Sequence, residues 1–368
     1  MSESSEKKAT GGVFARTSSG LVRTVSTFDT FYYCLAMVSL PIGFLNLAVL
    51  VFYPGASYTL AIVLAMVGSI LLGLTYALFS AIYPRSGAEY VPLSRATHPI
   101  VGFVASFSTV FWLMFYPGVA PASAASFGWA PLFTVLGLQT GSEGLINLGF
   151  WFDSPVGWFV VGTVIILIIA LILYRGMAVY FKLQRWLFSA ALVGFVILLI
   201  VLALGAAGVL NFQASFDGYA GTGAYDGMIA AAAEAGAELN APFSGQMTLL
   251  FVIWPAFALL FAVWSTSFSG EVKDVTRGQL IAIPTAQLAG GVLLILLGVL
   301  GLGAIGGEAL RAFGWVGMLA PESLPLPIYP WLTTLASIMA DNILLTTIIQ
   351  VSALVLMILV AAVDAIYA

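Results

Sequence analysis

Charged side chains are scarce in this sequence. Of its 368 residues only 8% are charged and 61% are hydrophobic, and the mean hydropathy is +1.07. A soluble globular chain carries about 25% charged residues. The composition therefore excludes a soluble protein and predicts an all-α polytopic membrane protein.

Cysteine and histidine are almost absent as well. Cys34 is the single cysteine, so no disulfide can form within the chain and no cysteine metal site is possible. His98 is the single histidine, and its short basic loop suggests a solvated residue rather than a ligand. No cofactor or metal is expected. An intramembrane hydrolase is disfavoured, because it would need a nucleophile with a base or a metal cluster.

A signal peptide of the usual kind is not recognisable either. The first 20 residues are polar and rich in Ser, Lys and Gly, which is typical of disorder. We expect residues 1–26 to form a cytoplasmic tail and residues 27–368 to form one transmembrane transporter domain.

Long apolar runs, by contrast, are abundant. A helix needs about 20 mostly apolar residues to cross a bilayer. Residues 127–150 and 328–340 are also apolar, but Gly and Pro interrupt them, and we expect helices that lie on the outer surface. The predicted spans are eight: 30–52, 58–82, 100–122, 156–174, 184–208, 247–269, 279–303 and 342–364.

The basic residues predict the orientation of these spans. With a cytoplasmic N-terminus, 11 of the 12 Lys and Arg residues fall inside, and only Arg311 falls outside. The positive-inside rule favours this arrangement strongly over its reverse. We therefore expect a multi-pass protein of the cell membrane with both ends inside.

No ionisable residue lies near the centre of a predicted span. Asp29, Glu271, Asp341 and Asp364 all fall at span ends. Because an intramembrane charge usually marks an ion or proton path, this argues against a relay of buried carboxyl groups. A charged solute would then be bound by backbone dipoles and hydroxyl groups.

Two spans contain candidate breaks. In the first, Pro41 removes an amide and Gly43 tolerates unusual dihedral angles. In the sixth, Pro255 precedes a hydroxyl-rich run, 265–269, which could also be a face for helix packing. A broken membrane helix must face protein or a water-filled cavity, and such breaks are where secondary transporters bind solutes. Each break could equally be a simple kink.

Three motifs occur in a fixed order along the chain. Leu21-Val22-Arg23 with Ser26 and Phe28-Asp29 precedes the first span. Pro84-Arg85-Ser86-Gly87-Ala88-Glu89-Tyr90, ending at Arg95, follows the second. Gly270-Glu271-Val272-Lys273-Asp274 to Arg277 follows the sixth. Together they resemble the signatures of the amino acid–polyamine–organocation (APC) superfamily of permeases.

The resemblance implies a fold of two inverted five-helix repeats with broken helices 1 and 6. It implies a secondary active transporter that moves amino acids by alternating access, coupled to a proton or sodium gradient or to exchange. The substrate site would be formed by Ser39, Leu40, Pro41, Ile42 and Gly43 with Phe257, Ala258, Leu259, Leu260 and Phe261. Gating or structural roles would fall to Arg85, Gly87, Glu89, Arg95, Glu271, Lys273 and Arg277.

The chain departs from the superfamily in several places. The usual glycine of helix 6 is absent from 257–261, which suggests an apolar pocket wall. The lysine that some proton-coupled members carry in helix 5 is absent from 188–191. Sodium coupling would use hydroxyls of helix 8, with Thr346 and Thr347 as candidates, although such side chains usually bond to their own turn. Only three helices of the second repeat are present, so we expect a longer reading frame.

Other functions remain as alternatives. A polyamine or other amine permease would require an acidic residue inside the membrane. An amino-acid sensor would bind the solute without moving it. The expected partners are an amino acid or related amine, the lipid bilayer, and a proton or sodium ion, and nucleic acid is not expected.

Overall fold

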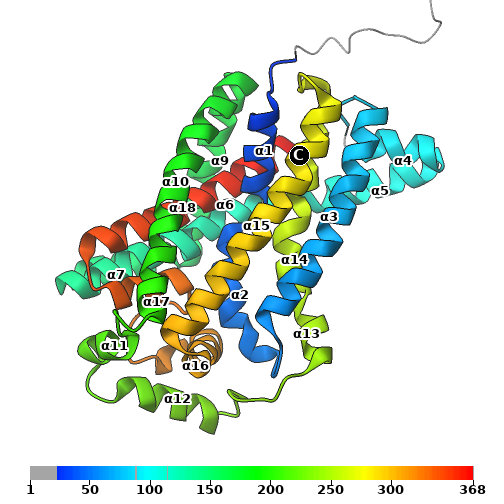
Figure 1. Ribbon diagram of the computed structural model, residues 1–368. Coiled ribbons are helices and arrows are strands. Elements are labelled where there is room, and N and C mark those ends of the chain that lie inside the picture. Colours follow the sequence, from blue (N-terminus) through cyan, green and yellow to red (C-terminus); the bar gives the residue numbers. More distant parts are fainter. Residues whose placement is uncertain (1–22, 88, 114, 368) are drawn as a thin grey trace, which may run out of the picture.

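The computed structural model describes residues 23–87, 89–113 and 115–367 (Figure 1). Most of the expected tail at 1–26 lies outside this part of the chain. The described residues are almost entirely helical, and their extended pairing is limited to an isolated parallel bridge between Val25 and Val272. The prediction of an all-α chain is confirmed.

Eight helical segments are long and apolar enough to cross a membrane. Seven of them coincide closely with predicted spans, and the polytopic class is confirmed. The segments are Thr27–Phe52, Tyr58–Ile82, Gly118–Thr140, Pro155–Tyr174, Met177–Ala206, Gly245–Glu271, Val275–Ile305 and Ile343–Asp364.

The third segment differs from the prediction. Residues 100–122 were expected to form one helix, but they are divided between α5 (Pro99–Leu113) and α6 (Tyr116–Ala124). α6 continues through a π-helical turn, η2 (Ala125–Trp129), into α7 (Ala130–Thr140). Pro121 and Pro131 each lack a backbone N–H donor, so each leaves a helical carbonyl without its usual hydrogen bond. The π turn between them and the neighbouring helices accommodate this loss. Residues 127–140 therefore belong to a span and not to a surface helix.

Serine side chains begin several helices, as local sequence rules predict. Ser26 and Asp29 form a capping box at the start of α1 (Thr27–Met37). Ser57 caps α3 (Tyr58–Ile82), Ser154 caps α9 (Pro155–Tyr174), and Ser244 caps α13 (Gly245–Phe251). The helix starts are thus encoded locally, whereas helix packing is not.

Three long helices form the frame of the molecule. α3, α10 (Met177–Ala206) and α15 (Val275–Ile305) run alongside one another in Figure 1, and α18 (Ile343–Tyr367) crosses them obliquely. Close approach of α15 to α3 depends on glycine, because a Cβ atom at Gly298 would lie 1.9 Å from the Tyr58 ring. The first and sixth spans lie within this frame.

Short helices gather at the end of the bundle away from the start of α1 (Figure 1). α17 (Leu332–Ala340) was expected on the surface, yet residues 332–339 are all buried. Its polar residues face neighbouring helices, which explains why hydropathy alone misplaced it. The others are α11 (Phe212–Ala220), α12 (Ala224–Glu234), α16 (Gly307–Leu319) and η4 (Pro321–Ser323), while α4 (Tyr90–Ala96) and α8 (Glu143–Phe152) are short helices elsewhere.

Candidate functional site

The first span is broken into two helices. α1 ends at Met37, and α2 runs from Leu40 to Val49, followed by η1 (Leu50–Phe52). Between them Val38 and Ser39 have ψ angles of 94° and 80°, outside the helical range. Pro41 then lies at the start of α2, where its missing amide costs nothing. The break therefore precedes Pro41 instead of surrounding it.

The sixth span changes its helical form twice. Pro255 has no amide to bond to the Phe251 carbonyl, and α13 gives way to α14 (Ile253–Leu259) at Val252. At Leu260 the α-helix becomes a 3₁₀ helix, η3 (Leu260–Glu271), of 12 residues. Runs of 3₁₀ helix longer than about four residues are uncommon and often mark a hinge. The change falls within the predicted 257–261.

The two irregular segments touch through their backbones. The amide of Ser39 donates a hydrogen bond of 3.1 Å to the carbonyl of Ala258. The Leu40 amide bonds to the Val38 carbonyl at 2.6 Å, and the Ile42 amide bonds to the Ser39 carbonyl at 2.9 Å. Ser39 and Ala258 are both buried. The breaks expected to face each other are thus in direct contact.

The side chains around this contact are apolar. Leu40, Ala258 and Leu259 are buried, and Leu260 is partly exposed. Phe257 and Phe261 lie in an aromatic cluster with Trp112 of α5, Tyr116 of α6 and Trp264 of η3. This arrangement matches the expected apolar wall.

Gly43 lies away from the contact. A Cβ atom there would lie 2.4 Å from the Leu294 side chain of α15. Gly43 therefore permits α2 to pack against α15, whereas the prediction placed it among the residues around the solute. Pro41 is buried and Ile42 is partly exposed.

Two glutamines of α15 support the sixth span, and sequence reasoning missed both. The amide of Gln287 donates to the Leu259 carbonyl at 3.4 Å, just where α14 ends. Gln279 exchanges hydrogen bonds with Ser265, at 2.9 Å to its carbonyl and 2.7 Å from its hydroxyl. The available signal was two amides on one face of an apolar helix, eight residues apart. The hydroxyl run thus acts in helix packing.

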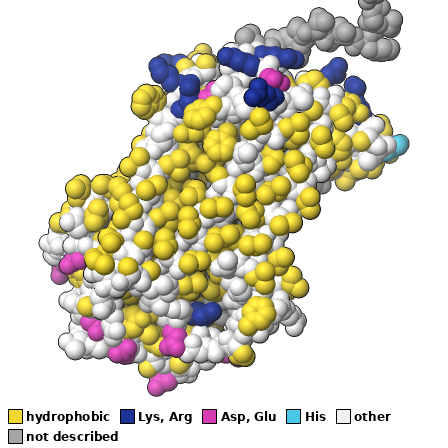
Figure 2. Space-filling view, in the orientation of Figure 1, with side chains coloured by type: hydrophobic (Ala, Val, Ile, Leu, Met, Phe, Trp, Pro, Cys, Tyr) yellow, Lys and Arg dark blue, Asp and Glu magenta, His cyan; other side chains and the backbone are white. Residues whose placement is uncertain are grey.

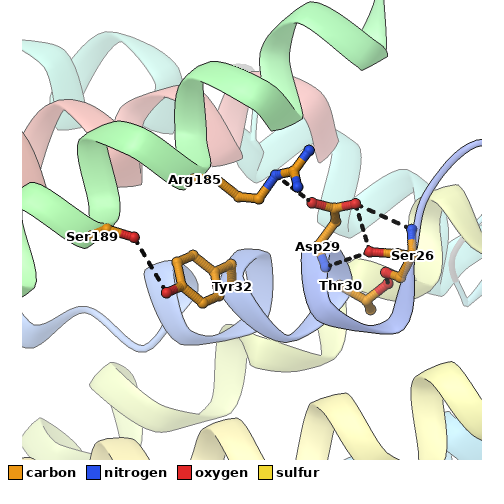
Figure 3. Close-up of polar contacts among 6 residues, drawn as sticks. All are labelled: Ser26, Asp29, Thr30, Tyr32, Arg185 and Ser189. Atoms are coloured by element: carbon orange, nitrogen blue, oxygen red, sulfur yellow. Dashed lines mark hydrogen bonds and ion pairs between the residues drawn. The ribbon is translucent and has the colours of Figure 1, made fainter.

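Polar contacts tie α1 to α10 near the basic end of the molecule (Figure 3). The guanidinium of Arg185 lies 3.0 Å from the Asp29 carboxylate, and the hydroxyls of Tyr32 and Ser189 are 3.3 Å apart. Asp29 also bonds to Ser26 in the capping box. Asp29 is only 7% exposed, whereas the Arg185 side chain is 49% exposed.

The sequence motifs meet at the same end. Val25 donates to the Glu271 carbonyl at 3.1 Å and accepts from the Lys273 amide at 3.0 Å. The Gly87 amide bonds to the Ser267 carbonyl at 3.4 Å. These hydrogen bonds join the segment before α1 and the segment after α3 to the C-terminal part of η3 and the residues that follow it.

The other motif residues have different local surroundings. Arg95 lies over the Tyr83 ring at 5.6 Å, a cation–π contact within its own loop. Glu89 is buried. Arg85 and Arg277 are exposed.

The two threonines proposed as ion ligands behave differently. Thr347 donates to the Ile343 carbonyl of its own helix at 2.8 Å. The buried Thr346 accepts a hydrogen bond of 2.9 Å from Gln139 of α7. Neither contact joins them to the Ser39–Ala258 pair.

Asp364 lies at the end of its candidate span, as expected, but its surroundings were not foreseen. Its side chain is fully buried on α18, and neither carboxylate oxygen has a hydrogen-bond partner among the described residues. Hydropathy along the chain locates a span end but does not show which helices cover it. Packing of α18 against α1, α6 and α10 encloses it.

Two adjoining hollows open elsewhere, lined by Asp153 and Trp331. Their volumes are about 540 and 550 Å³. Burial, reinforced by the negative charge of Asp153, raises the pKa of Tyr329 in the wall of the first. Neither hollow includes a residue of the two breaks.

Comparison with known families adds one match. A family model described as "Amino acid permease" matches residues 28–367. No curated protein matches the sequence. The match covers nearly all described spans and both irregular helices, in agreement with the predicted superfamily. The chain therefore belongs to the amino acid permease family, and is a multi-pass membrane transporter.

Proposed function

We propose that this permease moves amino acids with apolar side chains across the cell membrane by alternating access. The proposal depends on one observation, the 3.1 Å hydrogen bond from the Ser39 amide to the Ala258 carbonyl. These two groups are the complements of the charged groups that every amino acid carries. The amide suits a carboxylate, and the carbonyl suits an ammonium group.

The half-helix dipoles support the same assignment. Ser39 stands at the start of α2, where the partial positive charge favours an anion. Ala258 stands near the end of α14, where unpaired carbonyls favour a cation. A solute that inserts between the breaks would replace their mutual hydrogen bond with two of its own.

The surrounding side chains limit the solute. Leu40, Phe257 and Phe261 supply apolar surface, and the described residues beside the Ser39–Ala258 contact add no carboxylate that would bind a second ammonium group. An apolar side chain on the solute would gain contacts here, whereas a charged one would lose its hydration.

A polyamine or other amine permease is the second candidate. The observation that favours it is the buried carboxyl group of Asp364. Its neighbour Tyr33, however, precedes Ser39 by six residues of sequence, which corresponds to about 9 Å along a helix. This separation favours a role for Asp364 apart from the solute.

The charge distribution supports a cytoplasmic N-terminus. Figure 2 shows Lys and Arg gathered at one end of the molecule and Asp and Glu at the other. The basic end carries the motif loops and Arg185, and the acidic end carries α11, α12 and α16. Under the positive-inside rule the basic end faces the cytoplasm.

The test is uptake into proteoliposomes. The purified chain would be supplied in turn with labelled leucine, phenylalanine, alanine, arginine and spermidine under imposed proton or sodium gradients. We expect accumulation of the apolar amino acids. Accumulation of spermidine alone would transfer the assignment to the second candidate, and saturable binding without flux would indicate a sensor.

One substitution isolates the Ser39 amide. Ser39→Pro removes the N–H group, while the native φ of −67° suits proline and Val38 is already extended. We expect Ser39→Pro to abolish uptake and Ser39→Ala, which retains the amide, to reduce it less. Equal uptake by the two variants would contradict the assigned role of the amide.

A further inference from the structure

Asp364 is an acidic residue that the solute site does not use. It lies on α18, its side chain is 0% exposed, and both carboxylate oxygens are without a hydrogen-bond partner among the described residues. An unpaired charge buried within a protein is expensive, and buried acidic residues of membrane helices usually mark an ion or proton path.

Phenol groups of three helices that pack on α18 lie near this carboxyl group. Tyr180 of α10 and Tyr116 of α6 are close enough to interact with it electrostatically. The Tyr33 hydroxyl of α1 donates to the carbonyl of Val363, the residue before Asp364, at 3.3 Å. The Tyr180 hydroxyl is itself buried without a partner among the described residues. The described surroundings of Asp364 therefore include phenol groups, and no hydrogen bond or ion pair among the described residues joins it to a basic side chain.

A counter-charge could come only from α1, α6 or α10 or from the other elements packed on α18. Arg185 of α10 is already paired with Asp29 of α1, as Figure 3 shows. Lys182 of α10 is exposed. The described titratable and charged residues on all the elements that contact α18 are Asp29, Tyr32, Tyr33, Cys34, Tyr116, Tyr174, Tyr180, Lys182, Arg185 and Glu271.

We propose that Asp364 is the proton-binding residue that couples this permease to a proton gradient. The inference rests on the proposed transport function. In the conformation described here, a proton on the carboxyl group removes the cost of an unpaired charge in the protein interior. A sodium ion would require several further oxygen ligands, whereas a proton requires only the carboxylate itself.

The position of Asp364 indicates a route by which its proton can be released to water. α18 contacts α1, the half-helix held to α10 by the Asp29–Arg185 pair. When that pair separates and α1 moves, water reaches the carboxyl group from the basic end of the molecule. The acidic proton then passes from the Asp364 oxygen to water, and the carboxylate that remains is stabilised by hydration. α1 can pack against α18 again only after Asp364 has bound another proton.

Infrared spectroscopy tests proton binding without any solute. The full chain in lipid would be titrated between acidic and alkaline pH, and the carbonyl stretch of protonated carboxylic acid recorded. We expect a band that Asp364→Asn lacks and that Asp341→Asn retains. Asp341 is a suitable control, because it is exposed at the opposite end of the bundle and its φ of 44° is tolerated by asparagine. Identical titrating bands in the wild type and in Asp364→Asn would overturn the proposal.

Transport provides the second readout. With the amino acid that the wild-type protein accumulates, Asp364→Asn should lose accumulation driven by a proton gradient yet still exchange labelled for unlabelled solute. If folded Asp364→Asn lost both accumulation and exchange and also lacked the infrared band, the result would still support proton binding by Asp364. Accumulation driven by sodium and unaffected by pH would refute it while the proposed function stands, whereas no flux in the wild type would refute the proposed function instead.

Discussion

At the residue scale, glycine decides where helices may approach. Gly314 of α16 packs against α2, and a Cβ atom there would lie 2.0 Å from the Ala48 carbonyl oxygen. A backbone atom cannot rotate away as a flexible side chain can. The C-terminal end of the first span is thereby held at a distance that only glycine permits.

Gly314→Ala should therefore lower stability by about 1–3 kcal/mol, because the added methyl group overpacks the contact with α2. Thermal unfolding in detergent would measure the loss. Gly227→Ala is the matched control, since Gly227 lies within α12 with open space around it. That change should stabilise the helix by about 0.5–1 kcal/mol. A similar melting temperature for the two variants would contradict the packing argument.

At the scale of elements, α1 is a half-helix held by few polar contacts. Its cysteine, Cys34, is fully buried and is the single cysteine of the chain. The Asp29–Arg185 pair and the contact of Tyr32 with Ser189 join α1 to α10. Reactivity of Cys34 with a maleimide therefore reports how often α1 leaves its place.

Arg185→Gln should speed this labelling, because it removes one restraint on α1. The Arg185 side chain is half-exposed, so the pair contributes about 1 kcal/mol at most. A shift of that size changes the open population by about fivefold. Arg175→Gln, at the exposed end of α9, is the control. Equal labelling rates in the two variants would show that the pair does not hold α1.

At the scale of the whole molecule, charge is separated between the two ends (Figure 2). Ala96, beside Arg95, is exposed at the basic end, and Ala214 on α11 is exposed at the acidic end. The two positions should therefore lie on opposite sides of the membrane.

Cysteine scanning would test this orientation in intact cells. In a Cys34→Ala background, an impermeant thiol reagent added outside should label Ala214→Cys and spare Ala96→Cys. Both should react after the cells are made permeable, which serves as the control. Labelling of Ala96→Cys from outside would reverse the proposed orientation.

Much of this protein was determined by sequence alone. Hydropathy and length located seven of the eight candidate spans, because a bilayer requires long apolar helices whatever their neighbours. Serine and proline at helix starts act locally, so the sequence also indicated that the first and sixth spans are irregular.

Only the tertiary structure decided which groups meet. The Ser39–Ala258 bond, the Gln287–Leu259 bond and the burial of Asp364 join residues far apart in the chain or depend on neighbouring helices. Hydropathy also divided the third span wrongly, because its π turn at 125–129 is fitted to α18 and not to a local pattern. Periodicity records which residues avoid water, but contact between helices depends on packing that no single helix encodes.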